Sequence, residues 1–127
     1  MRRLTLLVLL VAAMVAAASP ALAHRRATHR EAAAIGKVVH AYIAKKHSPV
    51  ARDAKITSVT VSTANRSYAL VRLRSHRAGP SKMLMHTKNH KWRVLGYAVG
   101  AFHCGLAPAK VFKDLLGNAH ACLPGGY

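Results

Sequence analysis

Apolar side chains recur along the chain with two different spacings, and each spacing predicts a different kind of element. Across residues 29–46 they return every three or four positions, which predicts an amphipathic helix. Thr28 and Glu31 form the T-x-x-E capping box that begins such a helix, and Ser48-Pro49 is a typical end. We therefore expect one N-terminal helix with a single apolar face.

Beyond this helix the spacing changes to alternation, or to runs of β-branched side chains, which is typical of strands. The runs cover residues 55–63, 68–75, 82–88 and 92–99. Short turns separate them, so we expect an antiparallel meander of four strands. One face of such a sheet must be covered, and the apolar face of the N-terminal helix is the natural partner.

Helical spacing returns between Cys104 and Cys122, where Pro108 is a typical first residue and Gly117 a typical stop. The apolar side chains of this stretch fall on one face and are Val111, Phe112, Leu115 and Leu116. The predicted fold class is α+β, with the N-terminal amphipathic helix packed on the four-stranded antiparallel meander and a short C-terminal helix pinned by a disulfide.

Residues 1–23 have the layout of a cleavable secretory signal. Two arginines precede an almost wholly apolar run at 4–18, and Ala21–Ala23 matches the small-residue cleavage motif. The alternative is an uncleaved anchor, since residues 4–23 are just long enough to span a bilayer. We favour cleavage and expect a protein that is secreted or held in the extracytoplasmic cell envelope, with no transmembrane segment after cleavage.

Cleavage after Ala23 leaves 104 of the 127 residues, enough for one domain with a modest core. We expect a basic arm at residues 24–28, a single domain at 29–123 and a mobile tail at 124–127. No second long apolar run follows the signal, so the sequence predicts no further membrane span.

An exported chain meets an oxidising compartment, where two thiols within bridging distance form a disulfide. Cys104 and Cys122 are the only cysteines, and their bond would close a loop of 17 intervening residues, which stabilises a fold by about 3 kcal/mol. The alternative is a zinc site that adds His103 and His120. Its ligand types are suitable, but the spacing matches no common zinc motif. We favour the disulfide and expect no metal or cofactor.

Three stretches carry a family resemblance: VSTANRSYALVRLRS, KWRVLGYAV and CGLAPAKVFKDLLG. Together they resemble a class of small secreted proteins of high-GC Gram-positive bacteria. The matching residues are Ser62, Thr63, Tyr68, Ala69, Trp92, Arg93, Val94, Cys104, Val111, Asp114 and Leu115. The resemblance implies export and a loosely cystatin-like α+β fold, and it implies no activity. The Gln-Val-Val-Ala-Gly loop of protease-binding cystatins is absent, which argues against inhibition of cysteine proteases.

Charge adds the strongest functional clue. The chain has 20 Lys and Arg against 3 Asp and Glu, a net charge of +17 with neutral histidines, and +15 without the two signal arginines. A field of this size attracts polyanions. If the strands alternate strictly, one sheet face interleaves cations with aromatic rings, as surfaces that bind nucleic acid do. The residues of this predicted anionic-ligand site are Tyr68, Arg72, Arg74, His86, Lys88, Arg93 and Tyr97.

The acidic side chains are too few and too scattered for an enzyme that uses paired carboxylates. They are Glu31, Asp53 and Asp114. The chain also lacks a Gly-rich phosphate loop, a G-x-S-x-G elbow and an H-E-x-x-H motif. We therefore expect a non-enzymatic basic domain that associates with anionic envelope or extracellular polymers, such as teichoic acid, nucleic acid or anionic lipid headgroups.

Three alternatives stay open. The basic surface can serve solubility alone. The chain can be a secreted protein-binding or inhibitor module that holds a protein partner through loops 76–81 and 100–107. It can also be a histidine-dependent phosphodiester hydrolase, in which a histidine acid and base act beside cations that hold the phosphate. The residues for that chemistry are His86, His90, Lys88 and Arg72.

Overall fold

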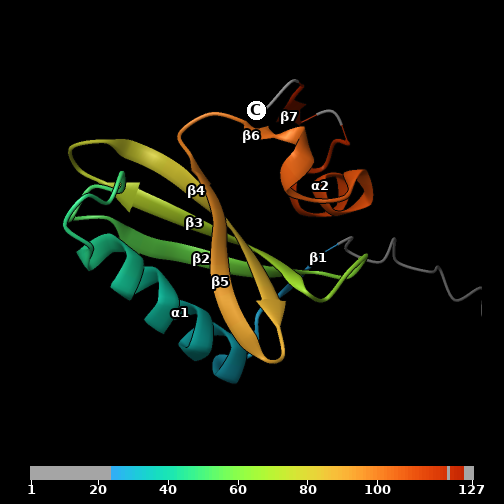
Figure 1. The fold of residues 1–127 in the computed structure, drawn as a ribbon, viewed down its shortest axis with the longest axis horizontal. Coiled ribbons are helices and arrows are strands. Elements are labelled where there is room, and N and C mark those ends of the chain that lie inside the picture. Colours follow the sequence, from blue (N-terminus) through green and yellow to red (C-terminus); the bar gives the residue numbers. More distant parts are fainter. Residues whose placement is uncertain (1–23, 120, 125–127) are drawn as a thin grey trace, which may run out of the picture.

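The computed structural model describes residues 24–119 and 121–124. The predicted signal peptide and residues 125–127 of the predicted tail lie outside these ranges, and so does His120 of the alternative zinc site. The described chain runs in the order β1, α1, β2, β3, β4, β5, β6, η1, α2, β7 (Figure 1). Within this part of the chain, neither α-helix is long and apolar enough to cross a membrane.

Five antiparallel strands form the main sheet, in the spatial order β1-β2-β3-β4-β5. Their bounds are His24–Arg26 for β1, Lys55–Ser62 for β2, Tyr68–Ser75 for β3, Gly79–Lys88 for β4 and Lys91–Ala98 for β5. A second, parallel sheet pairs β6, Phe102–His103, with β7, Cys122–Leu123. The predicted fold class is therefore wrong, because the molecule is richer in sheet than a single four-stranded meander.

The fifth strand of the main sheet comes from residues predicted to be a basic arm. In β1, Arg25 lies opposite Val61 of β2. The guanidinium of Arg25 also donates to both carboxylate oxygens of Glu31, at 2.7 and 2.9 Å. A bidentate pair of this kind fixes orientation as well as distance. The expected arm is thus ordered as an edge strand joined to the start of the next helix.

Helix α1, His29–Ala44, begins where the capping box predicts. The hydroxyl of Thr28 accepts from the backbone N–H of Glu31 at 3.2 Å, and the backbone N–H of Thr28 donates to the Glu31 carboxylate at 3.0 Å. Both bonds satisfy N–H groups that have no partner within the helix. The helix ends at Ala44, two residues before the predicted end.

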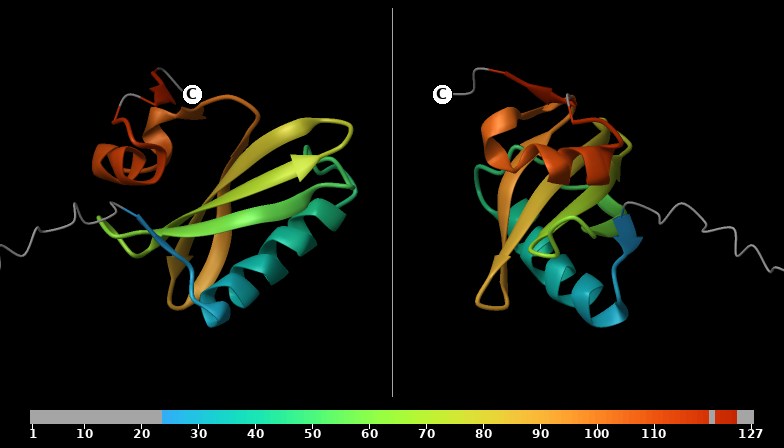
Figure 2. Two further views of the ribbon diagram at one scale, coloured as in Figure 1. Left: turned by 180° about the vertical axis from the view of Figure 1, so that it is seen from behind. Right: turned by 90° about the vertical axis from the view of Figure 1, so that its right-hand side faces the viewer.

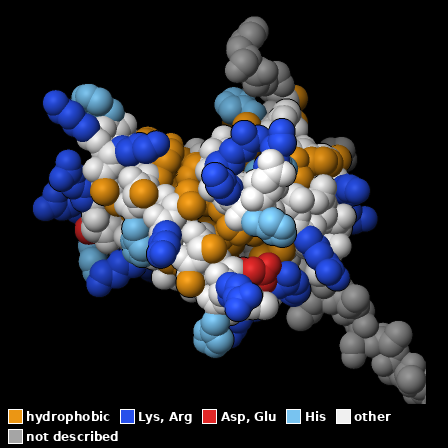
Figure 3. Space-filling model, turned by 60° about the horizontal axis from the view of Figure 1, so that its bottom comes forward, with side chains coloured by type: hydrophobic (Ala, Val, Ile, Leu, Met, Phe, Trp, Pro, Cys, Tyr) orange, Lys and Arg blue, Asp and Glu red, His pale blue; other side chains and the backbone are white. Residues whose placement is uncertain are grey.

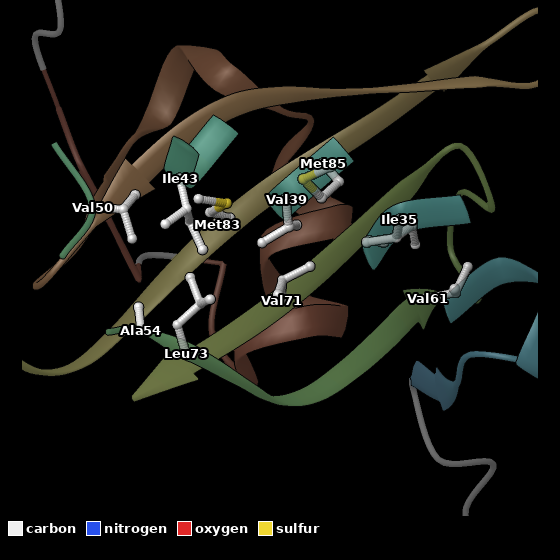
Figure 4. Close-up of a cluster of buried hydrophobic side chains, with 11 residues drawn as sticks. Ile35, Val39, Ile43, Val50, Ala54, Val61, Val71, Leu73, Met83 and Met85 are labelled. Atoms are coloured by element: carbon white, nitrogen blue, oxygen red, sulfur yellow. The ribbon is translucent and has the colours of Figure 1, made fainter. Parts of the chain in front are cut away.

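The first core lies between α1 and one face of the sheet. Ile35, Val39 and Ile43 of α1 point toward the strands (Figure 4). The buried side chains that meet them from β2, β3 and β4 are Val61, Ala69, Val71, Leu73, Met83 and Met85. The helix and this sheet face therefore form one continuous apolar layer, which is the helix-on-sheet packing that the sequence predicts.

The second core lies on the opposite face of the sheet, under the C-terminal segment (Figure 2). This segment contains β6, the short 3-10 helix η1, Cys104–Leu106, and α2, Ala109–Leu116. The buried members of this core are Leu70, Leu84, Phe102, Ala107, Val111, Phe112 and Leu115. Helix α2 ends at Gly117, whose φ of 78° is in the left-handed region that favours glycine.

The predicted disulfide between Cys104 and Cys122 is confirmed. It joins η1 to β7 and makes no bond to α2, so the prediction that it pins the helix itself is wrong. The helix lies within the loop that the disulfide closes. The crosslink therefore brings together the two ends of the C-terminal segment.

Candidate anion-binding site

The strand register places three cations on the face of the sheet that is opposite to α1. Arg72 of β3 lies opposite Lys82 of β4, and Arg74 lies opposite Pro80. Residues directly opposite each other in an antiparallel pair share a face, and so do residues two apart on one strand. The side chains of Arg72, Arg74 and Lys82 therefore leave the sheet on the same side, next to the second core.

These three side chains line a pocket of about 390 Å³. The remaining lining residues are Thr57, Leu73, Pro80, Ser81 and Val99. The described lining thus combines three cations with two hydroxyl-bearing residues and contains no acid. Val99 is 65% exposed. This side chain gives the polar pocket an apolar wall that is open to solvent.

The ammonium group of Lys82 is partly buried and lies near the positive charge of Arg72. Burial lowers the pKa of this lysine below its usual value, and the positive charge of Arg72 lowers it further. The ammonium nitrogen lies 5.8 Å from the centroid of the Phe102 ring, within the range of a cation–π contact. An aromatic face stabilises this cation only partly, so a bound anion would add the interaction that the pocket lacks.

All three acidic side chains are engaged away from this pocket. Glu31 pairs with Arg25, and this is the only ion pair among the described residues. Asp53 accepts a hydrogen bond from the hydroxyl of Ser75 at 2.6 Å and one from the backbone N–H of His76 at 2.9 Å. These bonds, first that of Ser75, lower the pKa of Asp53.

The third acid, Asp114 of α2, is 5% exposed and turns toward the turn between β2 and β3. One of its carboxylate oxygens accepts from the hydroxyl of Ser62 at 2.5 Å and from the backbone N–H groups of Thr63 and Ala64 at 2.7 and 3.1 Å. In the part of the chain that the structure covers, the other lysines and arginines therefore have no carboxylate partner. Figure 3 shows the consequence: Lys and Arg side chains are spread over the face in view, with few acidic side chains among them.

The predicted site is divided into two regions. Tyr68 lies opposite His86, which lies opposite Arg93, on the same face as the pocket but farther along the strands. The rings of Tyr68 and His86 are 4.8 Å apart between centroids. Lys82 and His86 are four positions apart on β4, which is about 13 Å along a strand.

The C-terminal segment fills the space between the two regions, because it packs on Leu70 and Leu84. Gly96, opposite Leu84, allows this close approach: a Cβ atom there would lie 2.7 Å from the Cδ1 atom of Leu106. Lys88 lies at the far end of β4, opposite Lys91. Arg72 and Arg74 therefore belong to the pocket, whereas the other predicted cations of this face do not.

Tyr97 lies on the wrong side for the predicted site. It pairs with Met83 and packs against the core under α1. The register shifts between Leu84 and Met85, where β5 contains one extra residue. A β-bulge of this kind reverses the alternation beyond it. Strict alternation therefore predicts the wrong face for Tyr97.

Lys82 is absent from the anionic-ligand site that the sequence predicts. In the sequence-based prediction the third strand begins at Lys82 itself, after a turn that follows residue 75. In the structure β4 begins at Gly79, directly after a short turn, and this early start sets Lys82 opposite Arg72. The sequence does contain one signal for this register, which is the short connection between the third and second predicted strands. A tight hairpin turn fixes the register of the two strands that it joins.

The residues of the alternative hydrolase are not brought together. Arg72 is opposite Lys82, about 13 Å along β4 from His86. His90 lines a separate hollow of about 290 Å³ with Arg66 and Trp92, beside the start of α1. The structure therefore places the predicted phosphate-holding arginine far from the predicted histidine pair.

No group of three or more His, Cys, Asp or Glu side chains that could hold a metal ion is found within residues 24–119 and 121–124. The disulfide also removes both thiolates from the alternative zinc site. Comparison with known proteins gives no further guide: no protein-family model, no curated protein and no solved structure matches the chain. The resemblance to small secreted, cystatin-like proteins stays a prediction.

Proposed function

We propose that the protein is exported and acts as a non-enzymatic domain that binds anionic polymers of the cell envelope or the extracellular space. The observation that carries this proposal is the uncompensated positive charge of the described surface, whose three carboxylates are all engaged in internal contacts. Such a surface attracts polyanions over distances of about a Debye length, which is about 8 Å at physiological salt. The disulfide supports the export part, because such bonds persist in oxidising compartments.

The binding is electrostatic in origin, so it has a characteristic salt dependence. Each cation that neutralises a phosphate or carboxylate on the polymer releases a counterion, and the logarithm of the affinity falls linearly with the logarithm of the salt concentration. The slope reports how many contacts the folded surface makes at once. A fold that holds several cations at fixed positions makes more simultaneous contacts than the same chain without the fold.

The test begins with the full chain expressed in a Gram-positive host. The mass of the exported form shows whether the signal has been cleaved after Ala23. This form is then titrated with teichoic acid, DNA and anionic vesicles over a salt series, beside the same chain after reduction and alkylation to an unfolded state. Neutral dextran is the control polymer.

We expect the folded form to bind one anionic polymer at least tenfold more tightly than the unfolded chain of equal formal charge. Equal affinities of the two forms would mean that the charge is generic and would overturn the proposal. Retention of the whole chain inside the cell would overturn the export part separately.

A further inference from the structure

We infer that the pocket formed by Arg72, Arg74 and Lys82 is a binding site for a single phosphate group carried by a larger molecule. The inference rests on the proposed function and goes further, because it names the chemical group and the residues that hold it. It separates a defined site from the diffuse positive charge of the rest of the surface.

The first support is that two of the three cations, Arg72 and Lys82, repel each other across the paired strands. Like charges directly across two strands are destabilising, and Arg72 lies directly across from Lys82. Burial of the ammonium lowers the pKa of Lys82, and this repulsion lowers it further. Local features that work against the fold without an evident structural gain are expected at functional sites. A bound anion would offset the repulsion between Arg72 and Lys82.

The second support is the spacing of the donors. Arg72 and Arg74 are two residues apart on β3, so their Cα atoms are about 7 Å apart and both side chains leave the same face. Each guanidinium offers a planar fork of N–H groups, and the Lys82 ammonium offers a point charge from the neighbouring strand. A carboxylate presents its oxygens in one plane, which matches the geometry of a single fork. A phosphate group presents its oxygens tetrahedrally, so donors that approach from two neighbouring strands can reach it from different directions.

The third support is the size and lining of the pocket. Its volume of about 390 Å³ is in the range of small-ligand sites, so it suits one charged group with its attached carbons rather than a length of polymer. Thr57 also lines this space, and its hydroxyl donates to the backbone carbonyl of Arg72 at 3.2 Å, which joins β2 to β3 beside the pocket. The exposed side chain of Val99 is placed to contact the carbon atoms that carry the phosphate.

The test uses the exported protein and three small probes: inorganic phosphate, glycerol 3-phosphate and acetate. Binding is followed by calorimetry and by backbone amide chemical shifts. The pocket variants are Arg72→Gln and Lys82→Met. The matched control is Lys37→Gln, which removes one positive charge from an exposed position on α1.

We expect glycerol 3-phosphate to shift amides of β3 and β4 around the pocket and to bind at least tenfold more tightly than acetate. Arg72→Gln and Lys82→Met should each weaken this binding at least tenfold, and Lys37→Gln less than twofold. Lys82→Met should keep or raise the melting temperature, because it removes a partly buried cation beside Arg72. This variant thus keeps the test decisive if Arg72→Gln does not fold.

Two results would overturn the inference that the pocket binds a phosphate group. One is that all three variants weaken the binding of glycerol 3-phosphate equally, and the other is that acetate binds as tightly as glycerol 3-phosphate. Failure of the pocket is distinguishable from failure of the proposed function, because polymer binding with a steep salt slope can persist without the pocket. The source of the phosphate is then found by titrating each variant with teichoic acid, single-stranded DNA and phosphatidylglycerol vesicles. The source that loses affinity with Arg72→Gln and Lys82→Met, but not with Lys37→Gln, is the one that the pocket selects.

Discussion

The two layers that cover the sheet are held in place by different forces. On one face α1 contributes four turns and an apolar stripe to a core shared with β2, β3 and β4 (Figures 2 and 4). On the other face α2 is only 8 residues long. Helices of that length are marginal in water and need tertiary contacts to persist.

Polar and covalent bonds supplement the shorter apolar contact of α2. The buried carboxylate of Asp114 accepts from Ser62, Thr63 and Ala64, which ties the helix to the turn between β2 and β3. A ring nitrogen of His24 lies 2.9 Å from the backbone carbonyl oxygen of Asp114, within hydrogen-bonding distance, so β1 contacts the same helix. The disulfide closes the segment around it. A short helix can therefore cover a sheet when a few strong bonds hold it in place and compensate for its smaller apolar contact.

The largest effect is expected from breaking the polar attachment of α2. Asp114→Ala removes hydrogen bonds to a charged acceptor, each worth about 1.5–3 kcal/mol, and leaves the donors of the β2–β3 turn without their partner. We expect the free energy of unfolding to fall by about 4 kcal/mol. Denaturant unfolding measures this loss, and native-state hydrogen exchange locates it.

Hydrogen exchange also provides the control for the same prediction. In Asp114→Ala the amides of α2 should lose more protection than those of α1, because local opening of the C-terminal segment becomes easier. Asp114→Asn keeps one acceptor oxygen and should lose about half as much stability. Equal loss of protection in both helices would contradict the view that the two layers are attached independently.

The next largest effect is expected from the disulfide. Cys104→Ser combined with Cys122→Ser opens a loop of 17 intervening residues and should lower the free energy of unfolding by about 3 kcal/mol. Dithiothreitol should bring the wild-type protein to the stability of this double variant and leave the variant unchanged. A variant as stable as the oxidised wild type would show that Asp114 and the second core hold the segment without the crosslink.

The same contrast explains how much of the fold the sequence predicts. The start of α1 is encoded within four residues, Thr28 to Glu31, and the structure has it at the predicted position. The edge strand β1 has no apolar alternation in its three residues, and its place depends on Val61 and its neighbours in β2, more than thirty positions away. Local signals are readable along the chain, whereas a pairing between distant segments is not.

The residues of the candidate site show the same difference between local patterns and distant pairings. Alternation alone predicts that Arg72 and Arg74 share a face, and the register confirms it. The third cation, Lys82, depends on where β4 begins, and the side of Tyr97 depends on a bulge that lies between the strands rather than within one of them. Both features arise from the pairing of β4 with its neighbours, which the alternation within a single strand does not specify.

The smallest expected effect lies on the α1 side and depends on pH. Glu31 has its pKa lowered from 4.5 to about 2, first by the hydrogen bond from Arg25. A carboxyl whose pKa is lower in the folded state stabilises the fold fully above pH 4.5, and this contribution is lost as the pH falls toward about 2. Glu31→Gln keeps a side chain that can complete the capping box and removes only the charge.

At pH 7 we expect Glu31→Gln to lower the free energy of unfolding by about 1 kcal/mol, because solvent screens this partly exposed pair. The difference between variant and wild type should shrink below pH 4.5 and be largely lost near pH 2, where about half of the wild-type carboxyl groups are protonated. Melting curves of both proteins between pH 2 and 7 measure this, with 1 M salt at pH 7 as a second way to screen the pair. A difference that stays constant over this range would mean that the charge of Glu31 does not stabilise the fold. In that case the ionic link between β1 and α1 would contribute nothing, and apolar packing with helix capping would account for the whole attachment of this layer.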